Sequence, residues 1–280
     1  MIIKKCTEIS KKALHQLSLE SYKDYLVDVS MDYDTFYEKF IDYSEINLEQ
    51  SFVAIIDDQP VGFILGSIND YENIKTLRCA AFAVLKEFRN KNLGQELFKK
   101  HLKAGIENNC KRLFLEVIKE NKAKSFYLRE GYKIVDELFY YTLDLNNHAF
   151  EKDVPIDFKP ITNEEMNDYL IENNLHINYQ NHPIILKNSE ENKYYKLIHH
   201  DENIGAISYD ATGGLSILHL KDHYKKIEYL NSIFYYLRSK ENFQRIRLSV
   251  TSEMNHVSLF KTIGFKKDPI EQFEMIKSLY

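Results

Sequence analysis

Hydrophobic residues near the start of the chain follow first a helical and then a strand pattern. Residues 9–49 carry leucine, tyrosine and phenylalanine at three- and four-residue spacings, which predicts helices. Residues 51–68, SFVAIIDDQPVGFILGSI, form two apolar runs around the polar segment Asp57–Pro60. Two such runs flanking a turn-forming segment predict a β-hairpin.

Strands and helices then alternate as far as residue 145. The expected order is a buried strand at 77–85, an amphipathic helix at 93–108, a strand at 112–118, a helix at 121–130 and one or two closing strands at 132–145. The second helix should end at Gly131, because glycine readily adopts the left-handed backbone that ends helices. This mixture predicts an α/β fold.

A polar segment separates the chain into two halves. Asn146–Pro160 contains Pro155 and Pro160 and little apolar sequence. A chain of 280 residues is long enough for two domains. We therefore expect one domain at 1–150 and a second at 156–280.

The second half repeats the first weakly but in the same order. Four segments match: KLIHHDENIGAISY (196–209) with VAIIDDQPVGFILG (53–66), HLKDHYKK (219–226) with VLKEFRNK (84–91), IRLSV (246–250) with LFLEV (113–117), and LFKTIGF (259–265) with FYLREGY (126–132). Four matches in order indicate two copies of one fold.

Composition limits the location and the partners. Three distant cysteines (Cys6, Cys79 and Cys110) argue against a disulfide framework. The N-terminus MIIKKCTEIS lacks the apolar stretch of a signal peptide, and no apolar run approaches the roughly 20 residues that span a bilayer. A cytoplasmic protein that does not use a membrane is expected. The net charge of −5 and the absence of basic runs disfavour nucleic acid, and no CxxC or HExxH spacing suggests a metal site.

The segment from Val84 to Gly94 has the features of an anion site. A buried strand runs into a short loop, and the loop opens a helix, whose first N–H groups and positive dipole end attract phosphates. Gly94 permits close approach of a ligand. Asn90 and Asn92 are residues that tolerate left-handed backbone well, and Arg89 and Lys91 add positive charge.

This segment resembles the central motif of the GNAT N-acetyltransferases. The family writes Arg/Gln-x-x-Gly-x-Gly/Ala, and residues 89–94, RNKNLG, match it with Asn92 in place of the first glycine. A second family motif, a strand followed by Asn-x-x-Ala and Tyr-x-x-x-Gly-Phe, resembles Asn121–Ala123 followed by Tyr127 and Gly131–Tyr132. The resemblance covers residues 1–145 well and residues 155–280 weakly.

The resemblance implies two GNAT-like domains in tandem, each with a mixed, mostly antiparallel sheet flanked by helices. It also implies acetyl-CoA as co-substrate, no metal, and transfer of acetyl to an amine by direct attack. The implied cofactor-binding residues are Phe82, Ala83, Val84, Arg89, Asn90, Lys91, Asn92, Leu93, Gly94, Gln95 and Asn121.

Two catalytic residues follow from the chemistry of the motifs. The departing thiolate must gain a proton, and Tyr127 is the acid candidate, since a phenol stays protonated at neutral pH. The amine must lose one, and Glu116 is the base candidate because it is a lone carboxylate in an apolar strand. The second copy has Tyr224, Ile227, Tyr229, Ser249 and Phe260 at the aligned site positions, which predicts a degenerate, non-catalytic domain.

The acceptor is a primary amine of a small molecule or a peptide, and a cationic acceptor would suit the first helical region. Between Glu20 and Gln50 there are nine acidic and two basic residues, with tyrosines interleaved. Two other functions also fit the pattern: a non-catalytic acyl-CoA sensor, and an aminoacyltransferase of the tandem GNAT-like type. A monomer and a homodimer are both compatible with the sequence.

Overall fold

The computed structural model describes residues 1–187, 189, 191–251 and 257–280. The chain separates into two compact units: unit 1 is Met1–Val135 with Glu274–Tyr280, and unit 2 is Asp136–Phe273. The sequence analysis placed the boundary later, within 146–160, from local composition. The division into units comes earlier, because a strand that begins at Lys133 belongs to unit 2 from Asp136 onward.

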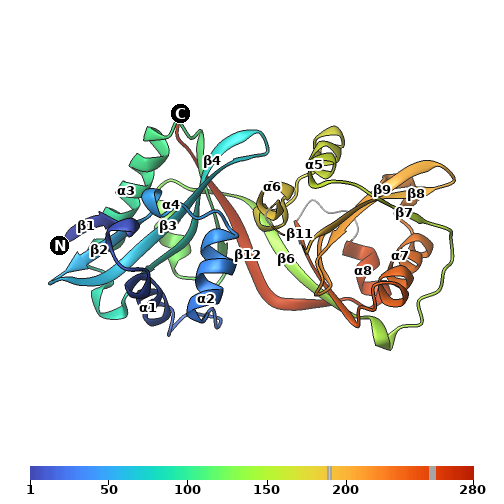
Figure 1. The fold of residues 1–280 in the computed structure, drawn as a ribbon, viewed down its shortest axis with the longest axis horizontal. Helices are drawn as coiled ribbons and strands as arrows, with labels where there is room; N and C mark the ends of the chain where they lie inside the picture. The colour runs from blue at the N-terminus through green and yellow to red at the C-terminus, as the bar shows by residue number, and fades with distance from the viewer. Residues whose placement is uncertain (188, 190, 252–256) are drawn as a thin grey trace. The chain divides into compact units, whose positions relative to one another are not determined.

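Unit 1 contains the hairpin, strands and helices that the sequence predicts for its first half and, in addition, an N-terminal strand that was not predicted (Figure 1). They are β1 (Ile2–Lys5), α1 (Lys11–Ser21), α2 (Tyr33–Thr35), β2 (Phe52–Ile56), β3 (Gln59–Tyr71), β4 (Ile74–Val84), α3 (Leu93–Glu107), β5 (Arg112–Ile118), α4 (Ala123–Arg129) and the start of β6 (Lys133–Asp144). A π-helix, Phe36–Asp42, continues α2. The predicted hairpin turn is confirmed, since Asp57 and Asp58 both have positive φ, as a tight β-turn requires.

Unit 2 repeats this order of elements. They are β7 (Asp157–Pro160), α5 (Asn163–Glu172), α6 (Pro183–Leu186), β8 (Lys193–His199), β9 (Glu202–Tyr209), β10 (Gly214–Leu220), α7 (Ile227–Ser239), β11 (Arg245–Thr251), α8 (Val257–Ile263) and β12 (Lys266–Ser278). Among the described residues, no helix has the length and apolar character needed to cross a membrane.

Strand pairing confirms the mixed sheet and the repeat. The neighbours in unit 1 run β1-β2-β3-β4-β5-β12, and those in unit 2 run β12-β6-β11-β10-β9-β8-β7. β4 pairs with β5 in parallel, and β10 pairs with β11 in parallel, whereas β2–β3, β3–β4, β8–β9 and β9–β10 are antiparallel. The register repeats as well, because Gly62 faces Val84 in unit 1 and Gly205 faces Leu220 in unit 2.

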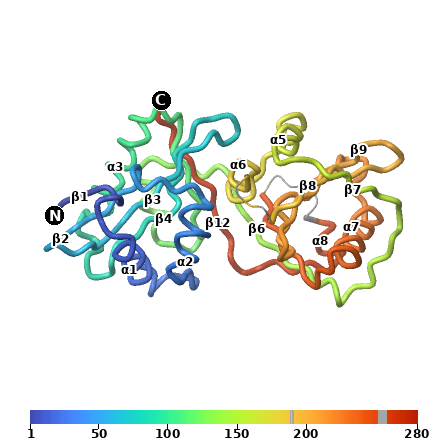
Figure 2. Tube along the Cα trace, in the orientation of Figure 1, coloured from blue at the N-terminus to red at the C-terminus, as the bar shows by residue number. Residues whose placement is uncertain are grey.

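The last strand of each unit is exchanged between the repeats. β12 follows α8 in the chain, yet it is the neighbour of β5, and its end, from Glu274, belongs to unit 1. β6 follows α4, yet it pairs with β11 from Asp144↔Arg245 to Leu138↔Thr251. Figure 2 shows the red C-terminal segment ending among the blue and green segments of unit 1.

Helices cover both faces of the unit 1 sheet. Leu14 and Leu17 of α1 are buried in one cluster with Phe63 and Leu65 of β3. Gly66, the next residue of β3, points the other way, and a Cβ placed there would meet His101 of α3 at 3.1 Å. Because successive strand residues face opposite sides, α1 and α3 lie on opposite faces. The ends of β4 and β5 therefore lie between two helical layers.

Candidate functional site

β4 and β5 diverge near the middle of the unit 1 sheet. Their described pairs run only over Thr76–Arg78 with Arg112–Phe114. Both strands continue further, and β4 stays paired with β3 as far as Val84. A β-bulge lies in this stretch, since Leu65 faces Ala81 and Gly66 faces Cys79, which leaves Ala80 as the extra residue. Bulges of this kind often occur next to binding sites.

A cavity of about 650 Å³ opens where the strands diverge. Its walls come from the end of α1 and the following loop, the end of β4, the β4–α3 loop, and the β5–α4 loop with α4. The predicted cofactor residues among its lining are Phe82, Ala83, Val84, Arg89, Asn90, Gly94 and Asn121. The structure therefore brings together seven residues that are scattered over three segments of the sequence.

The β4–α3 loop has the conformation that its asparagines predict. Asn90 and Asn92 both adopt left-handed backbone, with φ of 61° and 62°. Asn92 is the N-cap of α3, and the first intrahelical hydrogen bond runs from Glu96 N to Asn92 O at 3.1 Å. The preceding N–H groups of the first turn have no intrahelical acceptor, so they are available to an anion. A Cβ at Gly94 would lie 3.3 Å from Phe82 Cζ, so this position has little spare room.

Arg89 lines the cavity, but its guanidinium is engaged by protein groups. Nε donates to Val84 O at 2.9 Å, and Nη1 and Nη2 donate to the two carboxylate oxygens of Asp24 at 2.6 and 2.8 Å. These hydrogen bonds hold the pKa of Asp24 below its usual value. Arg89 thus joins the end of β4 to the segment after α1, and Asp24 offsets its positive charge.

Asn121 joins the opposite wall to the same segment. Its Oδ1 accepts from Ala123 N at 2.8 Å, which helps to start α4, and its Nδ2 donates to Tyr25 Oη at 3.3 Å. The segment after α1 is therefore attached on both sides of the cavity, through Asp24 and through Tyr25. Neither attachment was predicted.

The remaining predicted cofactor residues lie at the edge of the site. Lys91, Asn92, Leu93 and Gln95 are not part of the lining, and Leu93 is buried in the core. The lining instead includes Lys122 and Arg129 of the α4 region, two exposed cations that the sequence analysis did not select. Their only sequence signal was their proximity to Asn121 in a polar stretch.

Tyr127 is buried on α4, next to the cavity. Its ring centroid lies 6.3 Å from that of Phe82 and 5.7 Å from that of Tyr132. Burial raises the pKa of its hydroxyl well above the ordinary value, and nearby Cys79 and tyrosines add to this effect. Tyr127 therefore keeps its proton at neutral pH, as an acid must.

Glu116 is also buried, but it is held in an ion pair. Its Oε2 accepts from Arg78 Nε at 2.9 Å, and the two side chains are 3% and 10% exposed. Its Oε1 has no hydrogen-bond partner among the described residues. Glu116 and Tyr127 are both absent from the cavity lining, so the structure does not place the two catalytic candidates together on its wall.

Strand pairing identifies the residues of unit 2 that correspond to Arg78 and Glu116, and both differ from their counterparts. The pair Arg78↔Phe114 corresponds to Gly214↔Arg247, so Gly214 stands where unit 1 has Arg78. Ser249 occupies the fifth position of β11, as Glu116 does in β5, and accepts from Asn178 Nδ2 at 2.9 Å and Asn181 Nδ2 at 2.7 Å. In this region a small cavity of about 10 Å³ is lined by residues 176–178 together with residues of β10 and β11.

The loop that precedes α7 is shorter than its counterpart. In unit 1 the segment 89–92 separates the 3-10 turn Lys86–Phe88 from α3, whereas in unit 2 only 225–226 separates Asp222–Tyr224 from α7. Ile227 is therefore the first residue of α7 and corresponds to Leu93. The sequence alignment, which set Ile227 against Asn92 and Tyr229 against Gly94, was wrong at these positions because it did not allow for the shorter loop.

Comparison with known proteins agrees with this geometry. Residues 12–132 match the family model for the acetyltransferase (GNAT) family. No curated protein sequence matches the chain. The match covers unit 1 from α1 to the glycine turn after α4, the part that carries the cavity.

Solved structures share the fold over the whole chain at low identity. A GCN5-related N-acetyltransferase from Sphaerobacter thermophilus is 12% identical with a TM-score of 0.65, over 99% of this chain and 95% of that one. A tandem GNAT protein from the clavulanic acid biosynthesis pathway is 14% identical with a TM-score of 0.60, over 95% and 94%. A putative acetyltransferase from Pyrococcus horikoshii is 14% identical with a TM-score of 0.59, over 100% and 89%. Residues 12–132 thus match the GNAT family model, and over nearly its whole length the chain shares the fold of GNAT proteins.

Proposed function

We propose that unit 1 binds acetyl-CoA and transfers its acetyl group to a primary amine of a small molecule or peptide. The observation that carries this proposal is the cavity at the divergence of β4 and β5. The open edge of β4 suits the extended pantetheine arm of the ligand, which could hydrogen-bond to its backbone. The start of the long helix α3 suits a phosphate group.

The residues present fit such a ligand. The N–H groups around Gly94, behind the left-handed Asn90 and Asn92, would hold a pyrophosphate. The backbone of Phe82–Val84 would pair with the pantetheine arm along the edge that β5 leaves open. Because Asp24 already offsets the charge of Arg89, we assign the positive charge that would face a phosphate at this site to Lys122 and Arg129.

The proton transfers would use groups of unit 1. The burial that raises the pKa of Tyr127 keeps its hydroxyl protonated, so its proton is present when the thiolate leaves in acyl transfer. Tyr127 is therefore our candidate for the acid. Glu116 as the base stays a prediction, since its carboxylate has an ion-pair role with Arg78.

The acceptor would be cationic. Several carboxylates in the Glu20–Gln50 region already have local partners: Glu20 with Lys23, Asp24 with Arg89, Asp28 with Ser30, Asp32 with Thr35, and Glu49 with Lys5. Asp34, Glu38 and Asp42 are exposed in the same region. These carboxylates support an amine that carries a further positive charge, such as a polyamine or a lysine-rich peptide.

Unit 2 would not catalyse. Its shortened loop and Phe260 in place of Tyr127 support this reading. Titration calorimetry of the intact chain with acetyl-CoA should then give one binding site per chain. A stoichiometry of two would contradict the assignment of unit 2.

The function is tested with two measurements on the intact chain. Acetyl-CoA should raise the melting temperature, and free CoA should form when the chain is mixed with acetyl-CoA and a suitable amine from a panel. If acetyl-CoA does not bind, the proposed function is wrong. If it binds tightly but no amine in a broad panel releases CoA, the chain is better described as an acyl-CoA sensor.

A further inference from the structure

A second cavity lies beside the first and is separated from it by two tyrosines. The cavity has a volume of about 310 Å³ and is lined by residues between Ser18 and Ser30. Tyr22 and Tyr25 are the two residues that line both cavities. We call this pair the tyrosine wall.

The tyrosine wall is held in place from several directions. The two rings meet edge to face, with centroids 5.2 Å apart, and the Tyr22 ring packs against Phe63 at 6.1 Å. The Tyr22 hydroxyl lies near the backbone of Phe82, and the Tyr25 hydroxyl accepts from Asn121. The wall is thus attached to both β4 and the β5–α4 loop, the two sides of the cofactor cavity.

The wall stands at the reacting end of the proposed ligand. Phe82 is on the open edge of β4, and its ring centroid lies 6.3 Å from that of Tyr127, the proposed acid. On the other side of the cavity, Tyr25 accepts a hydrogen bond from Asn121. Since the acid must lie near the thiolate that it protonates, the acyl carbon must lie near the wall as well. An acyl chain longer than acetyl would meet these two rings.

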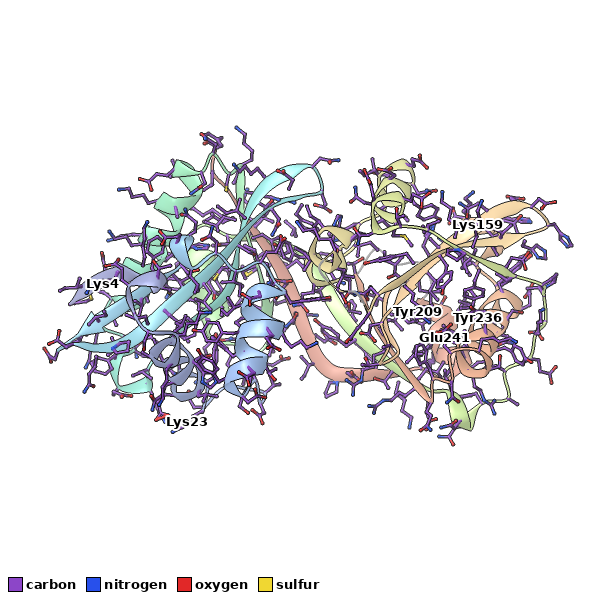
Figure 3. All side chains as sticks on the ribbon, viewed as in Figure 1. Lys4, Lys23, Lys159, Tyr209, Tyr236 and Glu241 are labelled. Carbon is purple, nitrogen blue, oxygen red and sulfur yellow. The ribbon has the colours of Figure 1, made fainter. Side chains whose placement is uncertain are left out.

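The space behind the wall is suited to an aliphatic chain. Leu19, Val27 and Val29 contribute apolar surface to it, and Asp28 and Lys23 add charged groups to the lining. Lys23, labelled in Figure 3 and located just after α1, is largely exposed and pairs with Glu20. The apolar residues, rather than these charges, would contact a chain that passed between the rings.

We propose that the tyrosine wall sets the acyl-chain length that this protein accepts, by closing the cofactor cavity against the second cavity. The inference rests on the proposed acyl-CoA function. It assigns Tyr22 and Tyr25 as specificity-determining residues, with short acyl groups as the ligands of the native chain. Removing one ring should join the two cavities and admit longer chains.

The experiment compares acetyl-, butyryl- and hexanoyl-CoA binding to the intact chain by calorimetry. Tyr25→Ala and Tyr22→Ala should bind hexanoyl-CoA at least tenfold more tightly than the native chain does, since each methylene buried contributes roughly fourfold. Tyr25→Phe and Tyr22→Phe keep the rings and should retain the native preference. Tyr33→Ala, which removes an exposed tyrosine of the same region, should retain it too.

The outcomes separate this inference from the proposed function. If the native chain binds hexanoyl-CoA as tightly as acetyl-CoA, or if neither alanine variant changes the preference, the wall does not set chain length. If both alanine variants fail to fold, Tyr25→Leu, which keeps part of the bulk of the ring, is used instead. Its acyl-CoA preference should shift toward butyryl-CoA by a smaller amount, and the absence of any shift overturns the inference. Failure of the native chain to bind any acyl-CoA would instead reject the proposed function.

Discussion

Replacing Glu116 with glutamine should destabilise unit 1 before it affects chemistry. The carboxylate and the guanidinium of Arg78 are 2.9 Å apart, and both side chains are at least nine-tenths buried. Glutamine has nearly the same shape, but it leaves the positive charge of Arg78 without its partner. A buried charge that loses its partner in this way typically costs about 3–5 kcal/mol.

We expect a loss near the lower end of that range, about 3 kcal/mol, because Arg78 also interacts with a group other than Glu116. This is a large share of the roughly 5–15 kcal/mol by which proteins are stable. Urea unfolding followed by circular dichroism would measure it. The double variant Arg78→Met with Glu116→Leu removes both charges, and we expect it to recover most of the lost stability, since apolar replacement of a buried pair is often neutral.

Turnover in the same variants separates an ion-pair role from a base role. If the carboxylate is structural, the double variant should recover CoA release together with stability. If Glu116 is the base, turnover should fall by about 10²–10⁴ in both variants at whatever stability they retain. A Glu116→Gln protein as stable as the native chain would refute the ion-pair reasoning.

Three further predictions concern single residues. Gly94→Val should weaken acetyl-CoA binding in calorimetry, because its Cβ would press on Phe82 beside the helix start, whereas Gln95→Val outside the lining should not. Tyr127→Phe should lower turnover by about 10²–10⁴ with little change in acetyl-CoA affinity, and native turnover should show no loss from Tyr127 ionisation up to pH 10, since burial raises its pKa. Burial lowers the pKa of His101 to about 3, so below about pH 6.5 the unfolded chain binds one more proton than the folded chain. The free energy of unfolding should therefore decrease by up to ~1.4 kcal/mol for each unit by which the pH falls below that value. Urea melts at pH 5 and 7 would measure this slope, and His101→Leu should flatten it.

Local features of the fold and site were predictable because they depend on neighbouring residues. Asp57 and Asp58 form a hairpin turn, and Asn90 and Asn92 adopt left-handed backbone, because their short polar side chains tolerate positive φ. The helix that begins at Leu93 and the strand Arg112–Ile118 follow from apolar periodicity. The cavity forms where these predicted elements end.

Long-range partners were not predictable from periodicity. Arg89 meets Asp24 and Tyr25 meets Asn121 only because the segment after α1 folds over the end of β4, and nothing in the local pattern of residues 22–26 indicates that position. Glu116 as a lone carboxylate in an apolar strand predicted burial correctly, but its partner Arg78 lies on a strand 38 positions away in sequence. The shortened loop before α7 was missed because a weak repeat does not reveal a two-residue deletion.

The exchange of β6 and β12 has a consequence for synthesis on the ribosome. Unit 1 needs Glu274–Tyr280, which are made only after the whole of unit 2, before β5 gains its second neighbour. During translation the first repeat therefore either exposes the unpaired edge of β5 or pairs β6 with β5 temporarily. An unpaired strand edge is prone to aggregation, and pairing of two strands that are far apart in sequence, such as β5 and β12, is slow. Synthesis of β12, rather than completion of the first repeat, would thus trigger the final folding step of unit 1.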